Sequence, residues 1–257
     1  KASPLALIAL GLSVGFRANI WNIGAEGQLT MGAIAAGGVA LAMPEASSWV
    51  VLPLMFIAGA LGGMLWASIP AVLKTRFNTN EILVSLMLVY VAGLFLSWLI
   101  HGPWRDPDGY GFPQSRMFEA SALLPVLLEE TRVHAGVLIT AVALGLAMVF
   151  FRWSLLAFQM RVSGLAPRAA AYAGFNQPRM VWIGLLIGGA AAGIAGTCEI
   201  AGPIGQLLMP LSPGYGFAAI IVAFVGRLHP VGILLASLLM ALLYLGGETA
   251  QMQLSLP

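Results

Sequence analysis

The sequence predicts an all-α fold: a polytopic transmembrane helical bundle with short or broken helices in two related halves. Hydrophobic residues make up 60% of the 257 residues and charged residues only 9%, far less charge than a water-soluble domain carries. The hydrophobic residues form long runs and do not alternate with polar residues, as they would in a transmembrane β-barrel. Residues 1–257 are therefore expected to form a single transmembrane domain. Because an apolar run follows Lys1 almost at once, we expect the chain to lack an N-terminal helix.

Seven or eight helical elements are expected in this bundle, from eight apolar segments. A helix that crosses a membrane needs about 20 residues, and the segments 50–72, 81–100 and 180–200 reach that length. The segments 28–43 and 216–226 are shorter and rich in Gly, which favours half-helices or re-entrant pieces. The remaining segments are 4–16, 136–151 and 231–246.

The helix expected at 81–100 begins with residues that favour a helix start. Thr79 or Asn80 is suited to cap the first turn, because a short polar side chain accepts a hydrogen bond from a free backbone N–H group. Glu81 then places a negative charge at the positive end of the helix dipole.

The distribution of Lys and Arg predicts which connections face the cytoplasm, since cytoplasmic loops carry an excess of both residues. The connection 73–80 contains Lys74 and Arg76, and the connection 152–179 contains four arginines and no acidic residue. We therefore predict that both are cytoplasmic. The segment 101–135 is predicted to be an extracytoplasmic loop. Its acidic residues are Asp106, Asp108, Glu119, Glu129 and Glu130.

Several functional classes are disfavoured by what the sequence lacks. It contains no His-Glu-x-x-His, Gly-x-Ser-x-Gly or Cys-x-x-Cys motif, and its three histidines are scattered. We predict no catalytic residue and no metal site. No basic patch with stacking aromatic residues is present, so we predict no nucleic-acid partner. No phosphate-binding Walker A loop is present either. ATP-driven work would therefore require another polypeptide to bind the nucleotide, and we expect this chain to bind no cofactor.

The polar, Gly-broken segment 19–33 is the main candidate for the border of a solute path. A charge at the bilayer centre costs at least about 2.5–3.5 kcal/mol, so Glu26 should face protein or water. It either contacts a solute or braces the broken segment by accepting backbone hydrogen bonds, and we favour the brace. Trp21 either stacks on a flat ring or anchors its helix, and we favour the anchor. The amides either lock the loop or bind a neutral polar solute; they are Asn19, Asn22 and Gln28.

Residues 22–43 weakly resemble residues 212–226 in sequence pattern. Both begin with a Gly-rich break and continue into a short apolar helix of small residues. Paired interrupted helices at corresponding places in two halves are typical of a transport site near the membrane midplane. The alternative is that Gly and Ala only permit close helix packing.

The second informative region is the basic segment 159–174, for which Ser163 or Pro167 can start a short helix and Gly174 can end it. Its Ala residues give that helix a surface of small side chains. Such a helix on the cytoplasmic side is suited either to a partner's groove or to an anionic lipid surface. The pattern leaves both alternatives open.

Four motifs resemble the inner-membrane permeases of ABC importers, in the superfamily of ribose and branched-chain amino-acid permeases. The resemblance extends over essentially the whole chain, and the order of the motifs agrees. It is strongest to the branch that handles nucleosides and simple sugars. The motifs are Asn22-Ile-Gly-Ala-Glu-Gly-Gln28, Asn80-Glu81 with Ser85–Leu88, Gly164 with Ala169-Ala170 and Gly174, and Gly214–Phe217 with Pro230-x-Gly232.

This resemblance implies roles for both regions of the chain. The solute path would involve the polar and aromatic residues Asn19, Trp21, Asn22, Glu26, Gln28, Ser85, Tyr215 and Phe217. The segment 161–174 would be a coupling helix that transmits closure of the ATPases. Its candidate residues are Arg161, Gly164, Pro167, Arg168, Ala169, Ala170 and Gly174.

The resemblance also implies partners, localisation and cargo. The expected partners are two cytoplasmic ABC ATPase subunits carrying ATP and Mg²⁺, a second permease subunit, an extracytoplasmic solute-binding protein and membrane lipid. The expected location is the bacterial inner membrane, as a multi-pass protein. The chain would be a transport subunit and not an enzyme. A nucleoside is the expected solute, and the alternative solutes are a simple sugar and a flavin-like compound. The alternative to an ABC importer is an ion-coupled secondary transporter.

Overall fold

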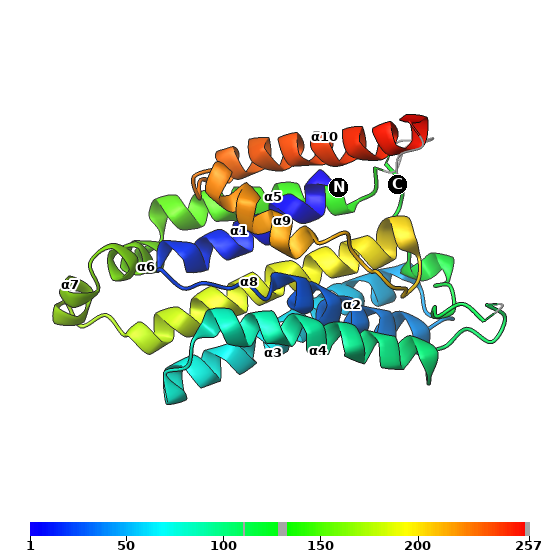
Figure 1. Cartoon of the computed structure of the whole chain (residues 1–257), viewed down its shortest axis with the longest axis horizontal. Helices are drawn as coiled ribbons and strands as arrows, with labels where there is room; N and C mark the ends of the chain where they lie inside the picture. Colours follow the sequence, from blue (N-terminus) through cyan, green and yellow to red (C-terminus); the bar gives the residue numbers. More distant parts are fainter. Residues whose placement is uncertain (110, 128–132, 255–257) are drawn as a thin grey trace.

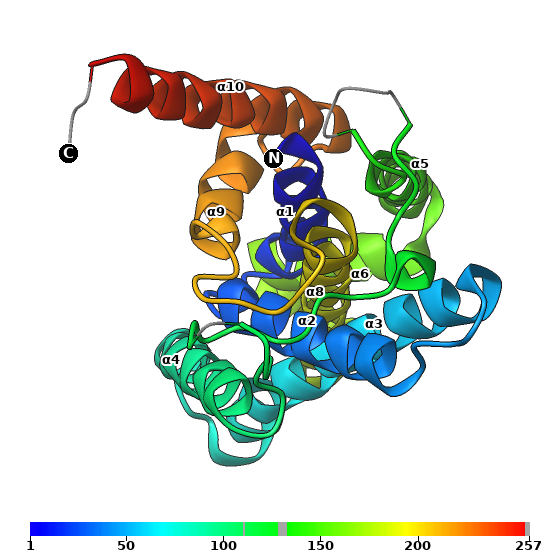
Figure 2. The same ribbon diagram turned by 90° about the vertical axis from the view of Figure 1, so that its right-hand side faces the viewer.

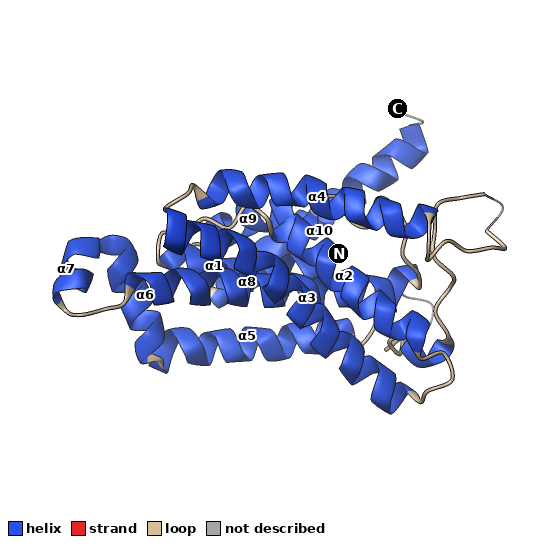
Figure 3. Cartoon of the chain, turned by 90° about the horizontal axis from the view of Figure 1, so that it is seen from below, coloured by secondary structure: helices blue, strands red, loops and turns tan. Residues whose placement is uncertain are grey.

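The computed structural model describes residues 1–109, 111–127 and 133–254. Within these residues the secondary structure is helical and no strand is formed (Figure 3), which confirms the predicted all-α bundle. Six residues of the predicted extracytoplasmic loop, 110 and 128–132, lie outside the described residues; they include two of its acidic residues, Glu129 and Glu130.

Each of the eight predicted segments corresponds to one α-helix. These helices are α1 (Ala2–Arg17), α2 (Ala25–Ala42), α3 (Ser48–Phe77), α4 (Glu81–His101), α5 (Gly136–Trp153), α8 (Gln177–Glu199), α9 (Tyr215–Val225) and α10 (Pro230–Leu254).

The described parts of the connections contain four further elements. A 3₁₀ turn, η1 (Ala120–Ala122), lies in the loop 101–135, and a π-helical turn, η2 (Ile200–Ile204), extends α8. The connection 152–179 contains α6 (Leu155–Leu165) and α7 (Pro167–Tyr172). Among the described residues, five helices are long and apolar enough to cross a membrane: α3, α4, α5, α8 with η2, and α10.

The helices run between two ends of different character (Figure 1). The α3–α4 connection and α7 lie at one end, which we call the basic end because it carries the arginines of the connections 73–80 and 152–179. The loop 101–135 lies at the opposite end, which we call the loop end. The connections predicted to be cytoplasmic and the loop predicted to be extracytoplasmic therefore lie at opposite ends of the bundle.

Helix α8 lies at the centre of the bundle, with α4 and α10 towards the periphery (Figure 2). Small residues allow this position, because they let helix backbones approach closely. A methyl group added at Gly63 of α3 would overlap the carbonyl oxygen of Gly189, and one added at Gly193 would overlap that of Gly59. Glycines one helical turn apart on α3 therefore face glycines one turn apart on α8.

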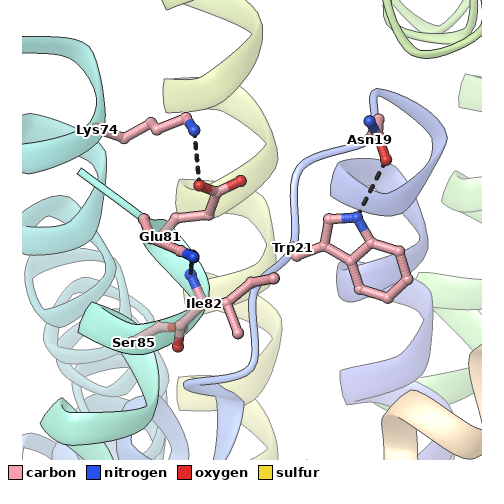
Figure 4. A network of polar contacts seen from close by, with 7 residues as sticks. Asn19, Trp21, Lys74, Glu81, Ile82 and Ser85 are labelled. Carbon is pink, nitrogen blue, oxygen red and sulfur yellow. Dashed lines mark hydrogen bonds and ion pairs between the residues drawn. The ribbon is translucent and has the colours of Figure 1, made fainter. Parts of the chain in front are cut away.

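The start of α4 confirms the predicted helix cap. The Asn80 side chain accepts a hydrogen bond from the Ile82 N–H group at 2.9 Å. Glu81 is buried in the first turn of α4. It forms an ion pair with Lys74, in the last turn of α3, at 2.8 Å (Figure 4). The α3–α4 connection is thus held by an ion pair between the two helix ends.

Candidate solute path and coupling segment

A pair of amides fixes the loop between α1 and α2. Asn22 Nδ2 donates to Gln28 Oε1 at 2.8 Å, and Gln28 Nε2 donates to Asn22 Oδ1 at 3.0 Å. Asn22 Oδ1 also accepts from the Gly24 N–H group. The two side chains are only 2% and 1% exposed. Because they hydrogen-bond each other, both amides serve the shape of the loop.

Ser85 attaches the same loop to α4. Its hydroxyl accepts a hydrogen bond from the Ile23 N–H group at 3.3 Å and donates to the Ile82 carbonyl oxygen. The loop backbone approaches so closely that a methyl group at Gly24 would lie 2.8 Å from the Ser85 carbonyl oxygen. Ser85 is itself 1% exposed, so the structure places it behind the loop.

Glu26 joins the N-termini of α2 and α9. Its Oε2 accepts a hydrogen bond from the Gly216 N–H group at 2.6 Å, and its Oε1 accepts from the Ser212 hydroxyl. The Ser212 hydroxyl oxygen in turn accepts from the N–H groups of Gly214 and Tyr215. The carboxylate therefore satisfies free donors at the first turn of α9, either directly or through Ser212.

The two helices leave this junction in opposite directions. Helix α2 runs towards the loop end and α9 runs towards the basic end (Figure 1). Each helix N-terminus carries a partial positive charge. Both helices begin near the middle of the bundle's length (Figure 1). The Glu26 carboxylate lies where these two positive helix ends meet. This is the arrangement expected of a brace.

A surface of aromatic and apolar residues lies beside this junction; we call it the aromatic face. Phe217, Ile221 and Phe224 are spaced i, i+4 and i+7, so they share one side of α9, and they are 40%, 56% and 43% exposed. Trp21 stacks on Phe224 with ring centroids 5.4 Å apart and an interplanar angle of 20°. Phe16 packs behind this stack, 5.0 Å from Phe224.

Asn19 lies next to the aromatic face and is exposed. It has a φ of 58° and accepts a hydrogen bond from Trp21 Nε1 at 3.0 Å (Figure 4). This bond orients the indole ring. The acceptor in this bond is Asn19 Oδ1, and the Nδ2 group forms no hydrogen bond among the described residues. It therefore remains a donor beside the exposed ring surfaces.

Apart from Tyr215, the predicted path residues therefore fall into two groups. Asn19, Trp21 and Phe217 are at least partly exposed around α9. A second group holds the α1–α2 loop and the first turns of α2 and α9 in shape: Asn22, Glu26, Gln28 and Ser85. Tyr215 is buried and packs edge-on against Tyr244 of α10.

Sequence reasoning missed two important residues of this region. Phe224 had a readable signal, because it lies seven residues after Phe217 on a helix that was expected there. Ser212 had no such signal, since its role depends on Glu26, which is 186 residues away in the sequence.

The predicted coupling segment 161–174 is divided between two helices. Ala166 separates them with an extended φ of −143°, as expected for a residue before proline. Pro167, one of the two predicted helix starts, is the first residue of α7. The other predicted start, Ser163, lies inside α6. After α7, Gly174 adopts a left-handed φ of 76° that favours glycine.

The members of the coupling set lie in different surroundings. Gly164 lies in α6, where an added methyl group would overlap the carbonyl oxygen of Arg17 in α1. Ala170 is completely buried. The exposed members are Arg161, Pro167, Arg168, Ala169 and Gly174.

Comparison with known proteins identifies the family. The family model for the branched-chain amino acid transport system / permease component matches residues 1–256. The glucose ABC transporter permease protein TsgB13 of Haloferax volcanii is 37% identical, with 100% of this chain and 70% of the relative covered. The guanosine ABC transporter permease protein NupP of Bacillus subtilis is 30% identical, with 100% and 74% covered.

Further relatives agree with this result. The nucleoside ABC transporter permease protein NupB of Lactococcus lactis subsp. cremoris is 29% identical, with 95% of this chain and 69% of the relative covered. No solved structure is significantly similar to the chain. The chain therefore belongs to the family of branched-chain amino acid transport system permease components and is a multi-pass inner-membrane transport subunit of an ABC transporter, not an enzyme.

Proposed function

We propose that this permease forms the path of an ATP-driven importer for a nucleoside. The observation that carries the proposal is the aromatic face beside Asn19. Exposed aromatic rings bind a planar base by stacking, and each stacked base contributes about 1–3 kcal/mol. The Asn19 amide adds a hydrogen-bond donor next to the rings. A flat heterocycle with polar edges fits this combination.

The names of the relatives support the same class of solute and also supply the alternatives. Two relatives are named for guanosine and for nucleosides, and another for glucose. A fourth, 27% identical, is named a probable riboflavin import permease protein. A simple sugar or a flavin-like compound therefore remains the alternative solute. A flavin shares the planar ring of a nucleobase, whereas a sugar would stack only through its C–H groups.

We further propose that the aromatic face of one subunit is completed by a second permease subunit. The face is exposed on the surface of this chain, and a solute bound there would be covered on one side only. Two ABC ATPase subunits and an extracytoplasmic solute-binding protein complete the proposed importer, as the family implies.

Helix α7 is the proposed contact to an ATPase subunit. It projects from the basic end of the bundle (Figure 3). Arg168 and Ala169 are exposed on it, and Tyr172 is 97% exposed. A short protruding helix with small side chains is suited to a partner's groove.

Uptake measurements on the assembled transporter test the solute. We expect Phe224→Ala to raise the KM for radiolabelled guanosine about 5–100-fold, the equivalent of one lost stacking contact. Phe95→Ala is the matched control, because Phe95 forms a comparable stack with Trp98 on α4. Uptake of radiolabelled glucose or riboflavin by the same transporter, with no uptake of radiolabelled guanosine, would refute the nucleoside assignment.

Measurements of ATP hydrolysis by the purified complex test the coupling role. We expect Ala169→Trp to abolish solute-stimulated hydrolysis, while Arg179→Gln, in the first turn of α8, leaves it intact. Ala169 is exposed, so the variant should still fold and enter the membrane. Unchanged stimulation in Ala169→Trp would refute the coupling role. Uptake by the permease alone, driven by a proton or sodium gradient, would instead favour a secondary transporter.

A further inference from the structure

Two adjoining cavities at the basic end belong neither to the aromatic face nor to α7. One has a volume of about 300 Å³ and lies between the end of α5, α6 and the start of α10. The other has a volume of about 360 Å³ and lies between the end of α1, α6 and the turn after α9. Both are lined by Arg17, Arg161 and His229; Arg152 is added in the first and Arg227 in the second.

The charge of these cavities is not compensated by the protein. No acidic residue lines either of them. Within the part of the chain that the structure describes, none of the four arginines forms an ion pair. Several guanidinium groups gathered around one hollow repel one another and produce a positive potential. Such a hollow attracts an anion.

Arg17 is already held in position for such an anion. Its guanidinium lies 3.6 Å from the centroid of the Phe151 ring, and its Nη2 donates to the Leu228 carbonyl oxygen at 2.6 Å. A guanidinium has five N–H donors in a fixed plane, so most of them remain free. This fork geometry matches the oxygens of a phosphate group.

The surroundings of the cavities are those of a membrane surface. Trp153 is 74% exposed at the end of α5, and aromatic residues of this kind gather at the membrane interface. Leu155, Phe158 and Leu165 of α6 are also exposed. Phe158 is three residues from Arg161, so the two lie on neighbouring positions of the helix surface. A helix that exposes both apolar and basic residues is suited to the bilayer interface.

We propose that these two cavities bind the phosphate head group of an anionic phospholipid from the cytoplasmic leaflet. Basic pockets between transmembrane helices on the cytoplasmic side bind lipid head groups. A soluble phosphate compound offers the same charge, but it has no acyl chains to cover the exposed apolar residues of α5 and α6. The bound head group would connect α6 to the ends of α1 and α9. This inference does not depend on which solute is carried.

Lipid titration of the purified full chain in detergent tests the site. Bound dioleoylphosphatidylglycerol is counted by native mass spectrometry, and the melting temperature is followed in parallel. We expect phosphatidylglycerol to bind and to raise the melting temperature, and dioleoylphosphatidylcholine to do neither. The double variant Arg152→Gln/Arg161→Gln should bind phosphatidylglycerol about 30-fold more weakly, the effect of two lost charges near the membrane surface.

The matched control is Arg168→Gln/Arg179→Gln, which removes two charges from the same end but outside both cavities. It should retain wild-type affinity for phosphatidylglycerol. An equal loss in both double variants would show a diffuse basic surface and overturn the site. Equal protection by inorganic phosphate would assign the cavities to a soluble anion and overturn the lipid assignment. Both double variants should melt as the wild type does without lipid, because the exchanged side chains are exposed.

Discussion

Removal of the Glu26 carboxylate tests whether it is a brace or a solute contact. The carboxylate accepts two hydrogen bonds, from Gly216 N–H and from the Ser212 hydroxyl. A hydrogen bond to a charged group contributes about 1.5–3 kcal/mol, and partial exposure of Glu26 reduces that figure. We therefore expect Glu26→Ala to lower the free energy of unfolding by about 2–4 kcal/mol. Glu26→Gln retains one acceptor and should lose about half as much.

The assay is thermal unfolding in detergent, followed by tryptophan fluorescence. For a chain of this size 1 kcal/mol corresponds to about 2–4 °C, so Glu26→Ala should melt about 5–15 °C below the wild type. The exposed Glu45, in the α2–α3 connection, supplies the control: Glu45→Ala should change the free energy of unfolding by no more than about 0.5 kcal/mol. If Glu26→Ala melts with the wild type but loses solute uptake, the brace is refuted and the carboxylate contacts the solute.

Three further perturbations follow from the structure. Gly63→Ala should destabilise or prevent folding because its methyl group meets backbone of α8, whereas Gly93→Ala, with open space around it, should change thermal stability by about 1 kcal/mol or less. Asn22→Ala and Gln28→Ala should each cost about 1–3 kcal/mol in thermal unfolding, and the double variant should cost less than their sum. Burial lowers the pKa of His134 below its ordinary 6.5, and its neutral Nδ1 accepts a hydrogen bond from the Gly136 N–H group. The unfolded chain therefore takes up this proton more readily than the folded chain, and the melting temperature should fall as the pH drops from above 6.5 to below it. His134→Gln should flatten that dependence.

The sequence was sufficient for the helices but not for the contacts that shape the site. Long apolar runs and the Asn80 cap are local signals, so α3, α4 and α8 were predictable from hydropathy and helix-start residues alone. The partner of Glu26 was not predictable, because Ser212 and Gly216 come near it only when the two halves of the chain pack together.

The coupling segment shows an intermediate case. Pro167 was a readable start signal, and the residue before a proline is restricted to extended backbone. The division at Ala166 therefore had a local cause, although the segment 161–174 was expected to hold a single helix. The packing of Gly164 on Arg17 could not be predicted from the local sequence, because a small residue does not show which helix will pack against it.

The Glu26 junction also constrains how the protein is assembled during synthesis. Glu26 enters the membrane with the first helices, but the residues that donate to it, Ser212 and Gly216, are 186 and 190 residues later in the chain. Until they are synthesised, the carboxylate must stay hydrated or paired elsewhere, because an unpaired charge in lipid is costly. A chain that stops before residue 212 therefore carries an uncompensated acid in its first half. Completion of α9 supplies its donors, so the last third of the chain is needed before the first third reaches its final structure.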